Sequence, residues 1–433
     1  MKKINTSAIS GMQELSPRDQ LIFNTIKDQI AKMYHLHGYQ YIETPVIERT
    51  DILLAKAGGD TEKQIYKVFK TAETSNESDQ ALRFDHTVPL ARYVVEHESN
   101  LAFPFKVTQI GRNFRGERAQ KGRFREFYQM DVDVIGRESL PVLYDADVVA
   151  TAFDALKTFI KPQMIVRISN RKILSGFLAS LGLSDKSKGI FNIIDHAEKV
   201  SIDATKSAFT ELGLSISQVA KILDFIKIHG KREQSIPALR ALEIKNELFK
   251  QGINELDSVL ELLERQGMSG VAIADMLIIR GLDYYTGTVF ETILPEYKNI
   301  GSICSGGRYE NLASNYTDQA FPGVGISIGL TRLFYVLQAN QLLEDYQTPI
   351  IDYVLIPLSE KEYTFTLDVA QSLRQHGKST DIIYSDKKLA DRMKYAAKIA
   401  QFVGVVGENE TKTQVIEFKN LTTGEKVSTK IKL

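Results

Sequence analysis

The 433-residue sequence predicts a mixed α/β (α+β) fold in two domains. A large α/β domain at residues 1–345 should be interrupted by a helical insertion at about residues 189–266, and a small α/β domain should follow at residues 346–433. Apolar residues alternate along the chain between the two-residue period of strands and the three-to-four-residue period of helices. In addition, Gln347-Thr348-Pro349 has the composition of a linker, and the chain is too long for one core.

The first helix should begin at Ser16. Ser16-Pro17-Arg18-Asp19 places a capping serine before a proline, with an acid three residues beyond the cap. Apolar residues continue at helical spacing to Tyr34, and His37-Gly38 should end the helix. Residues 39–42 then predict a strand that Pro45 stops, so this helix leads into the edge of a sheet.

Residues 103–136 predict two antiparallel strands joined by a long mobile loop around residues 119–123. A period of two gives the second strand a mainly polar face, Arg125, Phe127, Gln129, Asp131 and Asp133, and an opposite face of Tyr128, Met130, Val132 and Val134. Such a polar face either meets solvent or lines a pocket. The pattern by itself favours solvent.

The middle of the chain predicts helices and then strands. Leu, Ile and Phe recur at helical spacing from about Gly189 to Gln266, which predicts the helical insertion. Strand character returns at Asp283–Leu294 and at Phe321–Gly329. A helix should follow from Leu330, with Arg332 in its first turn.

The small domain predicts alternating strands and helices. We expect strands at residues 354–356, 381–384 and 402–406, a helix ending near Gly377, a Lys/Arg-rich helix after residue 384, and a hairpin around residues 422–424.

Composition limits the functional classes. Lys plus Arg equals Asp plus Glu at 54 each, so an RNA partner must use local basic patches. The single cysteine, Cys304, excludes an internal disulfide and suits a reducing compartment. No apolar run could cross a bilayer and no secretory signal follows Lys2-Lys3, so we expect a cytoplasmic protein without membrane contact. The seven histidines are scattered, and no zinc site is expected.

Arginines are the candidate phosphate ligands. Neither GxxxxGK[ST] nor a kinase glycine-rich loop is present, so side chains must hold any nucleotide. Arg115, Arg123, Arg280 and Arg332 lie beside acids or glycines in strand or strand-edge patterns. The planar guanidinium binds phosphate or carboxylate through two hydrogen bonds, although a lone arginine is usually a surface charge.

Five segments resemble the histidyl-tRNA synthetases, a family of class II aminoacyl-tRNA synthetases. GRNFRGERAQKGRFREFYQMDVDVIG at residues 111–136 resembles motif 2, and GVGISIGLTRL at residues 323–333 resembles motif 3. RGLDYYTGTVFE at residues 280–291 and SGGRYENL at residues 305–312 resemble the two peptides particular to histidyl enzymes. HGYQYIETPVIE at residues 37–48 resembles the dimer-forming motif 1, and the match is collinear over nearly the whole chain.

The resemblance implies a class II antiparallel-sheet catalytic domain with a helical insertion, an anticodon-binding domain at residues 346–433, and a homodimer formed through motif 1. The implied enzyme is a histidine–tRNA ligase. It would activate histidine with ATP, accompanied by Mg²⁺, to histidyl-adenylate and release pyrophosphate. It would then transfer histidine to the 3′ end of tRNA(His) and release AMP.

The resemblance also implies residue roles. Arg115 and Arg280 would be catalytic, the first at the α-phosphate and the second between that phosphate and the substrate carboxylate. The implied ATP-binding residues are Arg115, Glu117, Arg123 and Arg332. The implied histidine-binding residues are Asp85, Thr87 and Gln129 at the α-amino group, Asp133 and Tyr285 at the imidazole, and Tyr284 at the pocket wall. No protein motif would hold a metal.

Two departures from the family affect this transfer of roles. The family often has Glu at the positions of Asp85 and Asp133, and Ala at the position of Ser305. The shorter acids keep the charge, but they leave the contact distances open.

Two groups of basic and polar residues are candidates for contact with tRNA. Arg118, Gln120 and Lys121 would approach the acceptor end, although a solvated charged turn has the same sequence. Lys387, Lys388, Arg392, Lys394 and Lys398 mark a basic helix that would recognise the anticodon or simply face solvent.

The sequence disfavours two other functions. A non-catalytic regulatory paralogue would have lost the arginine peptide or the anticodon domain, and this chain has both. A proline or threonine enzyme is disfavoured by RGLDYY and by the Gln129 and Asp133 pair.

Overall fold

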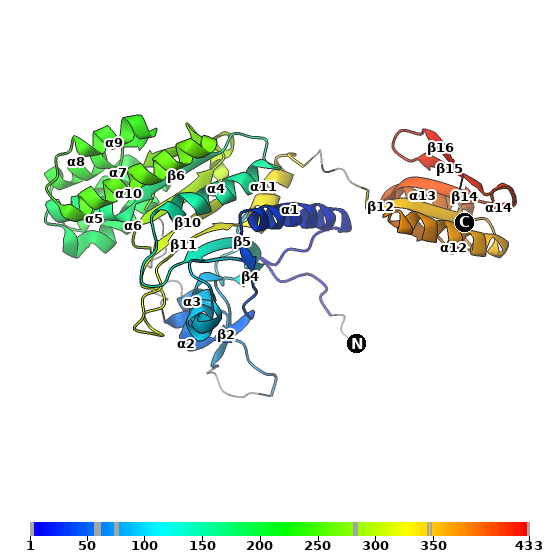
Figure 1. The fold of residues 1–433 in the computed structure, drawn as a ribbon, viewed down its shortest axis with the longest axis horizontal. Coiled ribbons are helices and arrows are strands. Elements are labelled where there is room, and N and C mark those ends of the chain that lie inside the picture. The colour runs from blue at the N-terminus through cyan, green and yellow to red at the C-terminus, as the bar shows by residue number, and fades with distance from the viewer. Residues whose placement is uncertain are drawn as a thin grey trace. The chain divides into compact units, whose positions relative to one another are not determined.

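The computed structural model describes residues 4–55, 62–72, 78–279, 285–343, 346 and 349–430, without the side chains of residues 298–300 and 429–430. The chain forms two compact units, Met1–Glu14 with Ile26–Leu342 and Leu15–Thr25 with Leu343–Leu433 (Figure 1). The first unit carries the sequence motifs for histidine and ATP. The second contains all of residues 346–433, the predicted small domain.

A nine-stranded sheet organises the described part of the first unit. Its strands run in the order β1 (Gln40–Tyr41), β4 (Phe105–Phe114), β5 (Glu126–Ile135), β11 (Gly323–Ile328), β10 (Cys304–Tyr309), β9 (Thr288–Ile293), β6 (Ile165–Asn170), β8 (Ala272–Asp275) and β7 (His229–Gly230). All neighbours from β4 to β6 are antiparallel, whereas β1 is parallel to β4 and β8 is parallel to β6. The predicted antiparallel sheet is therefore confirmed.

Strands β4 and β5 form the predicted antiparallel pair, in register from Phe105 opposite Ile135 to Phe114 opposite Glu126. The alternation of β5 is confirmed on its apolar side, since Met130, Val132 and Val134 are fully buried. The hydroxyl of Tyr34 donates to the Met130 carbonyl at 3.1 Å and ties α1 (Pro17–Leu36) to this strand.

Helix α1 begins as predicted. The backbone N–H of Asp19 donates to Ser16 Oγ at 3.2 Å, which caps the helix. The helix ends at Leu36, and Gly38 adopts a φ of 81° that a residue with a side chain would rarely accept.

The described helices of the first unit that follow α1 are α2 (Thr50–Leu54), α3 (Thr87–His97), α4 (Leu143–Lys157), α5 (Arg171–Ser180), α6 (Ser187–His196), α7 (Ile202–Glu211), α8 (Ile216–Phe225), α9 (Arg232–Arg240), α10 (Glu247–Leu263) and α11 (Leu330–Ala339). A small two-stranded sheet pairs β2 (Ile47–Arg49) with β3 (Gln80–Leu82). Helix α10 packs against α4, α5 and β6, so part of the region expected as an insertion covers the main sheet (Figure 1). The boundaries of the insertion stay a prediction.

The second unit is built on a five-stranded sheet. The strands lie in the order β13 (Thr380–Ile382), β12 (Ile351–Pro357), β14 (Ala400–Val406), β15 (Val415–Asn420) and β16 (Lys426–Lys430). Helices α12 (Tyr363–Gln375), α13 (Leu389–Ile399) and α14 (Glu408–Thr413) accompany them. The predicted strands, helices and hairpin are present, and α14 is an element that the sequence did not predict.

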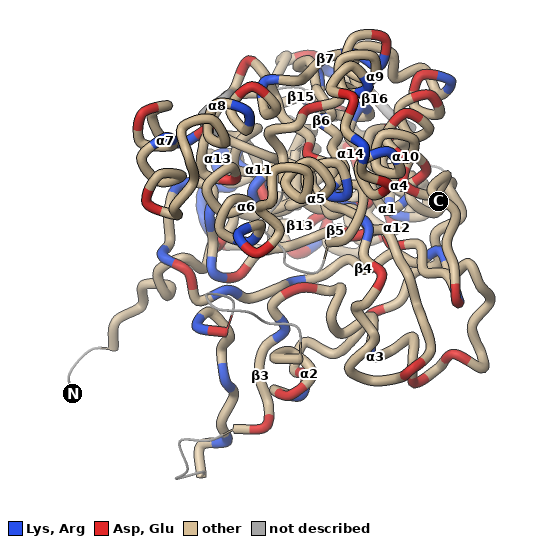
Figure 2. The backbone as a smooth tube through the Cα atoms, turned by 90° about the vertical axis from the view of Figure 1, so that its left-hand side faces the viewer, with Lys and Arg blue, Asp and Glu red and all other residues tan. Residues whose placement is uncertain are grey.

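Charges of both signs are interspersed along the helices α7, α8, α9 and α10 (Figure 2). Among the residues that the structure describes, no helix has the length and apolar character needed to span a bilayer.

Candidate active site

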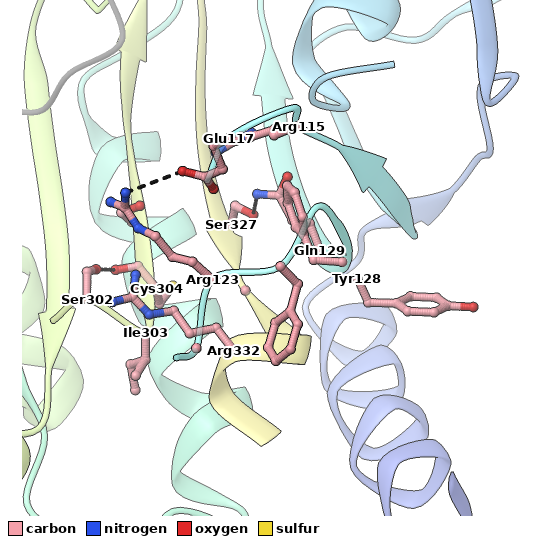
Figure 3. A pocket seen from close by; sticks show the side chains of 15 residues that line it. Arg115, Glu117, Arg123, Tyr128, Gln129, Ser302, Ile303, Cys304, Ser327 and Arg332 are labelled. Carbon is pink, nitrogen blue, oxygen red and sulfur yellow. Dashed lines mark hydrogen bonds and ion pairs between the residues drawn. The ribbon is translucent and has the colours of Figure 1, made fainter. Parts of the chain in front are cut away.

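An open pocket of about 230 Å³ is lined by strands β5, β11 and β10, by the loop that joins β4 to β5, and by the start of α11 (Figure 3). It brings together Arg115, Glu117, Arg123, Gln129 and Arg332. These residues include all the described candidates for ATP binding. We call this space the larger pocket.

Two aromatic rings hold Arg115 in place. Its guanidinium carbon lies 4.3 Å from the centre of the Phe84 ring and 5.1 Å from that of Phe127. Its Nε donates to the Phe84 carbonyl at 3.3 Å. Because the guanidinium is stacked and tethered through Nε, its terminal nitrogens are oriented before an anion arrives.

Glu117 and Arg123 form an ion pair within the loop between β4 and β5. Arg123 Nη1 lies 3.3 Å from Glu117 Oε2 (Figure 3). Arg332 enters the same pocket from the first turn of α11, as its sequence position predicted. The larger pocket therefore combines three arginines with one carboxylate.

A second, smaller pocket of about 20 Å³ adjoins the larger one. Its lining is Thr87, Asp131, Asp133, Tyr285, Ser305, Tyr309, Gly325, Ile326 and Ser327, and it shares Ser305 and Ser327 with the larger pocket. This volume is about that of one water molecule and is smaller than an imidazole ring. We call this space the smaller pocket.

Asp133 is the central acid of the smaller pocket. The hydroxyl of Tyr309 donates to its Oδ1 at 2.9 Å. Burial, followed by the nearby Asp131 carboxylate, raises the pKa of Asp133 to about 8, and the Tyr309 hydrogen bond opposes this shift. Gly325 stands opposite Asp133 in the β5–β11 register, and a Cβ there would collide with the carboxyl. The glycine therefore makes room for the acid.

Asp85 and Thr87 sit at the start of α3. Asp85 Oδ1 accepts the backbone N–H of Val88 at 3.0 Å. Burial raises the pKa of Asp85, while this hydrogen bond and the charge of Arg115 oppose the rise. Thr87 lines the smaller pocket, whereas Asp85 lines neither pocket, so a direct contact between Asp85 and substrate stays a prediction.

The remaining candidates lie outside the two pockets or outside the described residues. Arg280 and Tyr284 fall in residues 280–284, which the structure does not describe. Arg118, Gln120 and Lys121 are exposed on the loop between β4 and β5.

Several polar residues of the site were missed from the sequence. Asn113 Nδ2 donates to Gln129 Oε1 at 2.7 Å, and Gln129 Nε2 donates to Ser327 Oγ at 2.7 Å. His86 pairs with Asp131, and Tyr309 with Asp133. Asn113, Asp131, Tyr309 and Ser327 lie within the quoted motifs, and His86 stands between the candidates Asp85 and Thr87, which was the only available signal.

The long run of antiparallel strands and an arginine-lined pocket without a glycine-rich phosphate loop define the catalytic domain of a class II aminoacyl-tRNA synthetase. The model of the histidyl-tRNA synthetase family matches residues 11–333, and that of an anticodon binding domain matches residues 352–432. The chain belongs to the histidyl-tRNA synthetase family. It is therefore a ligase that uses ATP and charges tRNA with histidine.

Known proteins agree with this assignment over the full chain. The histidine–tRNA ligase of Clostridium tetani is 43% identical over 99% of this chain and 97% of its own, and that of Stenotrophomonas maltophilia is 41% identical over 95% and 92%. A crystal structure of histidyl-tRNA synthetase from Nostoc sp. PCC 7120 superposes with a TM-score of 0.88 at 36% identity, covering 99% of this chain and 97% of that one.

A structure described as an ATP phosphoribosyltransferase regulatory subunit/histidyl-tRNA synthetase from Bacillus halodurans has a TM-score of 0.76 at 22% identity. It covers 93% of this chain and 99% of its own. This likeness shows the fold alone.

Proposed function

We propose that the larger pocket binds ATP and the smaller pocket binds the imidazole of histidine. The observation that carries this proposal is their adjacency: the two pockets share Ser305 and Ser327, and β5 supplies Gln129 to one and Asp133 to the other. A single histidine can therefore reach from Asp133 toward the arginine-lined space. Its carboxylate would meet the α-phosphorus where the pockets join.

The reaction at this junction needs no protein nucleophile. The histidine carboxylate oxygen forms a bond to the α-phosphorus as the bond from that phosphorus to the departing pyrophosphate breaks. Carboxylate and triphosphate repel each other, so the protein must orient them and offset their charge. In this proposal Arg115 holds the α-phosphate, while Arg123, Arg332 and Glu117 bind the remainder of ATP.

Magnesium would enter as the complex of ATP. Glu117 is the one carboxylate among the described residues that line the larger pocket. Mg²⁺ prefers oxygen ligands and usually retains several water molecules and substrate phosphate oxygens. The triphosphate and water would therefore supply most of its ligands. The ion would neutralise charge on the phosphates.

Histidine recognition would divide between its two ends. Asp133 and Tyr285 would read the imidazole, and Tyr284 would shape the wall around it. Asp85, Thr87 and Gln129 would bind the α-amino group. A pocket built to pair with a polar ring leaves buried polar groups unsatisfied with an apolar amino acid, which gives selectivity.

Arg280 is proposed to bridge the substrate carboxylate and the α-phosphate. Because this contact strengthens as the two anions approach, Arg280→Ala should depress the turnover of histidine-dependent ATP–pyrophosphate exchange more than substrate affinity. Arg280→Lys keeps the charge but loses the fork, so it should remain impaired, though less than Arg280→Ala. Arg265→Ala is the matched control, because Arg265 is exposed and pairs with Glu261 on a helix surface. Exchange at the parental rate in a normally melting Arg280→Ala would exclude the bridging role.

The tRNA acceptor end is proposed to meet the loop of Arg118, Gln120 and Lys121. These exposed residues stand at the mouth of the larger pocket, next to Gly122 and Arg123 in its lining. The terminal ribose hydroxyl would attack the carbonyl of histidyl-adenylate and release AMP.

The anticodon of tRNA is proposed to bind a groove of about 610 Å³ in the second unit. It lies between the end of β13 and α13, and Tyr384 and Tyr395 line it with about half of each side chain exposed. Lys387 lines the same groove, as do Asp381 and Asp391. Exposed aromatic rings can stack on unpaired bases, lysines can neutralise phosphates, and carboxylates can accept from base amino groups.

Arg392 is a correction to the predicted basic helix. It is 9% exposed, and its Nη1 donates to the Pro357 carbonyl at 2.6 Å. It therefore anchors α13 to β12 and is not exposed like the lysines, although it still contributes to the lining of the groove. Lys387, Lys388, Lys394 and Lys398 are exposed.

Tyr384→Ala and Tyr395→Ala should each raise the Michaelis constant for tRNA by about tenfold, since stacking on one base contributes about 1 to 3 kcal/mol. Histidine-dependent pyrophosphate exchange should be unchanged, because it needs no tRNA. Lys412→Ala is the control, since Lys412 lies on α14 in the same unit and pairs with Glu408. Unaltered aminoacylation kinetics in both tyrosine variants would remove the groove from the RNA-binding surface.

A homodimer is proposed through residues 37–48. Strand β1 is one edge of the nine-stranded sheet, and Tyr41 in it is exposed, as are Leu36 at the end of α1 and Ile47 in β2. An unpaired strand edge flanked by apolar side chains is a surface that a second copy can cover.

A further inference from the structure

We propose that Asp131 is a positioning residue, held by His86 and Ser327, that fixes the α-amino side of the histidine site. No motif assigned a role to this carboxylate or to its two partners. The inference rests on the proposed placement of Asp85, Thr87 and Gln129 at the α-amino group. It explains how groups from distant parts of the chain are held around one small ligand.

Both oxygens of Asp131 are engaged. Its Oδ2 lies 3.0 Å from His86 Nδ1, and its Oδ1 accepts from Ser327 Oγ. A carboxylate can only accept here, so Nδ1 of His86 carries the proton. Asp131 is 4% exposed, and burial of a carboxyl group is costly unless hydrogen-bond partners such as these satisfy it.

The His86–Asp131 pair connects the two parts of the chain that are proposed to bind the α-amino group. His86 lies between Asp85 and Thr87, so its ring ties their loop to β5. Ser327, on β11, accepts from Gln129 Nε2 at 2.7 Å. Asp131 thus stands between the loop before α3 and the amide of Gln129, and movement of its carboxylate would shift both.

The backbone of His86 is held as well. Gln109 Nε2, from β4, donates to the His86 carbonyl at 3.1 Å, and Thr44 Oγ1 donates to Gln109 Oε1 at 2.9 Å. The ring and the carbonyl of His86 are therefore fixed by different strands. Such double fixation suits a residue that sets the position of its neighbours.

His86 carries a structural cost that simple packing does not require. The side chain is fully buried, and among the described residues its Nε2 has no hydrogen-bond partner. A buried unsatisfied nitrogen is unfavourable, and an apolar side chain would fill the space without it. What the histidine adds is the Nδ1–H that Asp131 accepts.

Histidine analogues separate positioning from general stability. Histidinol keeps the imidazole and the α-amino group, whereas 3-(imidazol-4-yl)propionate lacks the α-amino group. In Asp131→Ala and Asp131→Asn, the Michaelis constant for histidine and the inhibition constant for histidinol should rise together, by about tenfold or more in the alanine variant. The inhibition constant of the propionate should rise less than that of histidinol, since Asp131 also lines the smaller pocket beside Asp133, and the Michaelis constant for ATP should stay within about twofold of the parent.

Two substitutions at His86 test the same role, and one of them should restore affinity for histidine. His86→Leu should repeat the Asp131→Ala pattern, while His86→Asn, whose amide can donate to Asp131, should restore much of the affinity for histidine. Tyr34→Phe is the matched control, because it removes a buried hydrogen bond to the β5 backbone, at the Met130 carbonyl, and none of the hydrogen bonds of Asp131, His86 or Ser327. It should leave all four constants unchanged.

Each outcome decides the proposal. Equal weakening of histidinol and the propionate, or unchanged constants in Asp131→Asn and in folded His86→Leu, would overturn the positioning role. Gln129→Ala belongs in the same assays. If it leaves histidine affinity intact, the proposed α-amino site itself is wrong; if it weakens histidine but the Asp131 variants do not, only the present inference fails.

Discussion

Arg115→Ala should lower the rate of histidine-dependent ATP–pyrophosphate exchange by about 100-fold or more. That range is typical for the loss of one preorganised group that stabilises charge in a transition state. Arg115 is stacked between Phe84 and Phe127, so its fork is oriented in advance. Arg115→Lys keeps the charge but loses both the stacking and the fork, and should recover only part of the rate.

Arg112→Ala is the control for this experiment. Arg112 lies on β4, three residues before Arg115. Its Nη1 pairs with Glu126 at 2.9 Å, and more than half of the Arg112 side chain is exposed. Such a pair contributes about 0 to 1 kcal/mol, so exchange should stay near the parental rate. If Arg112→Ala and Arg115→Ala lowered exchange equally, or if neither did, Arg115 would have no special place in the reaction.

Asp133→Asn should raise the Michaelis constant for histidine at least about tenfold and leave that for ATP unchanged. The substitution removes a charge-assisted hydrogen bond to the imidazole, for which this loss is typical. The pKa of Asp133 is about 8, and that of a free imidazole is about 6.5. At neutral pH the Asp133 carboxyl and the imidazole of the substrate therefore hold about one titratable proton between them. Parental affinity for histidine should therefore fall above about pH 8, where the pair loses that proton, and the variant should lack this fall. An unchanged Michaelis constant in the variant would remove Asp133 from the site.

The same variant should alter the pH dependence of stability. Because the pKa of folded Asp133 lies above its ordinary value of 3.8, the folded state holds this proton more tightly than the unfolded state. The resulting stabilisation is complete below that ordinary value and is lost as the pH rises toward about 8. The melting temperature of Asp133→Asn relative to the parent should therefore rise between about pH 5 and about pH 8.5 without histidine. A constant or falling difference would contradict the raised pKa.

Local patterns predicted the elements of the site well. The cap at Ser16, the alternation of β5 and the place of Arg332 in the first turn of α11 each depend on residues close in sequence. The resemblance supplied the candidates Arg115, Gln129 and Asp133, which the structure places at two adjoining pockets.

Long-range pairing could not be predicted in this way. His86 and Asp131 are 45 positions apart, and Asp133 and Tyr309 are 176 positions apart. The β5 pattern alone favoured solvent for its polar face, and this was wrong, since Asp131 and Asp133 are both 4% exposed. Period two shows which residues share a face, but it does not show what the rest of the chain packs against that face.

One histidine is proposed to span the two pockets, with its ring at Asp133 and its activated carboxyl end at Arg115. A crystal structure with a non-hydrolysable histidyl-adenylate analogue tests it directly. The account predicts an imidazole nitrogen at about 2.6 to 3.2 Å from the Asp133 carboxyl, and the phosphate group at similar distances from the Arg115 guanidinium. An imidazole ring outside the smaller pocket, or a phosphate beyond the reach of Arg115, would contradict it.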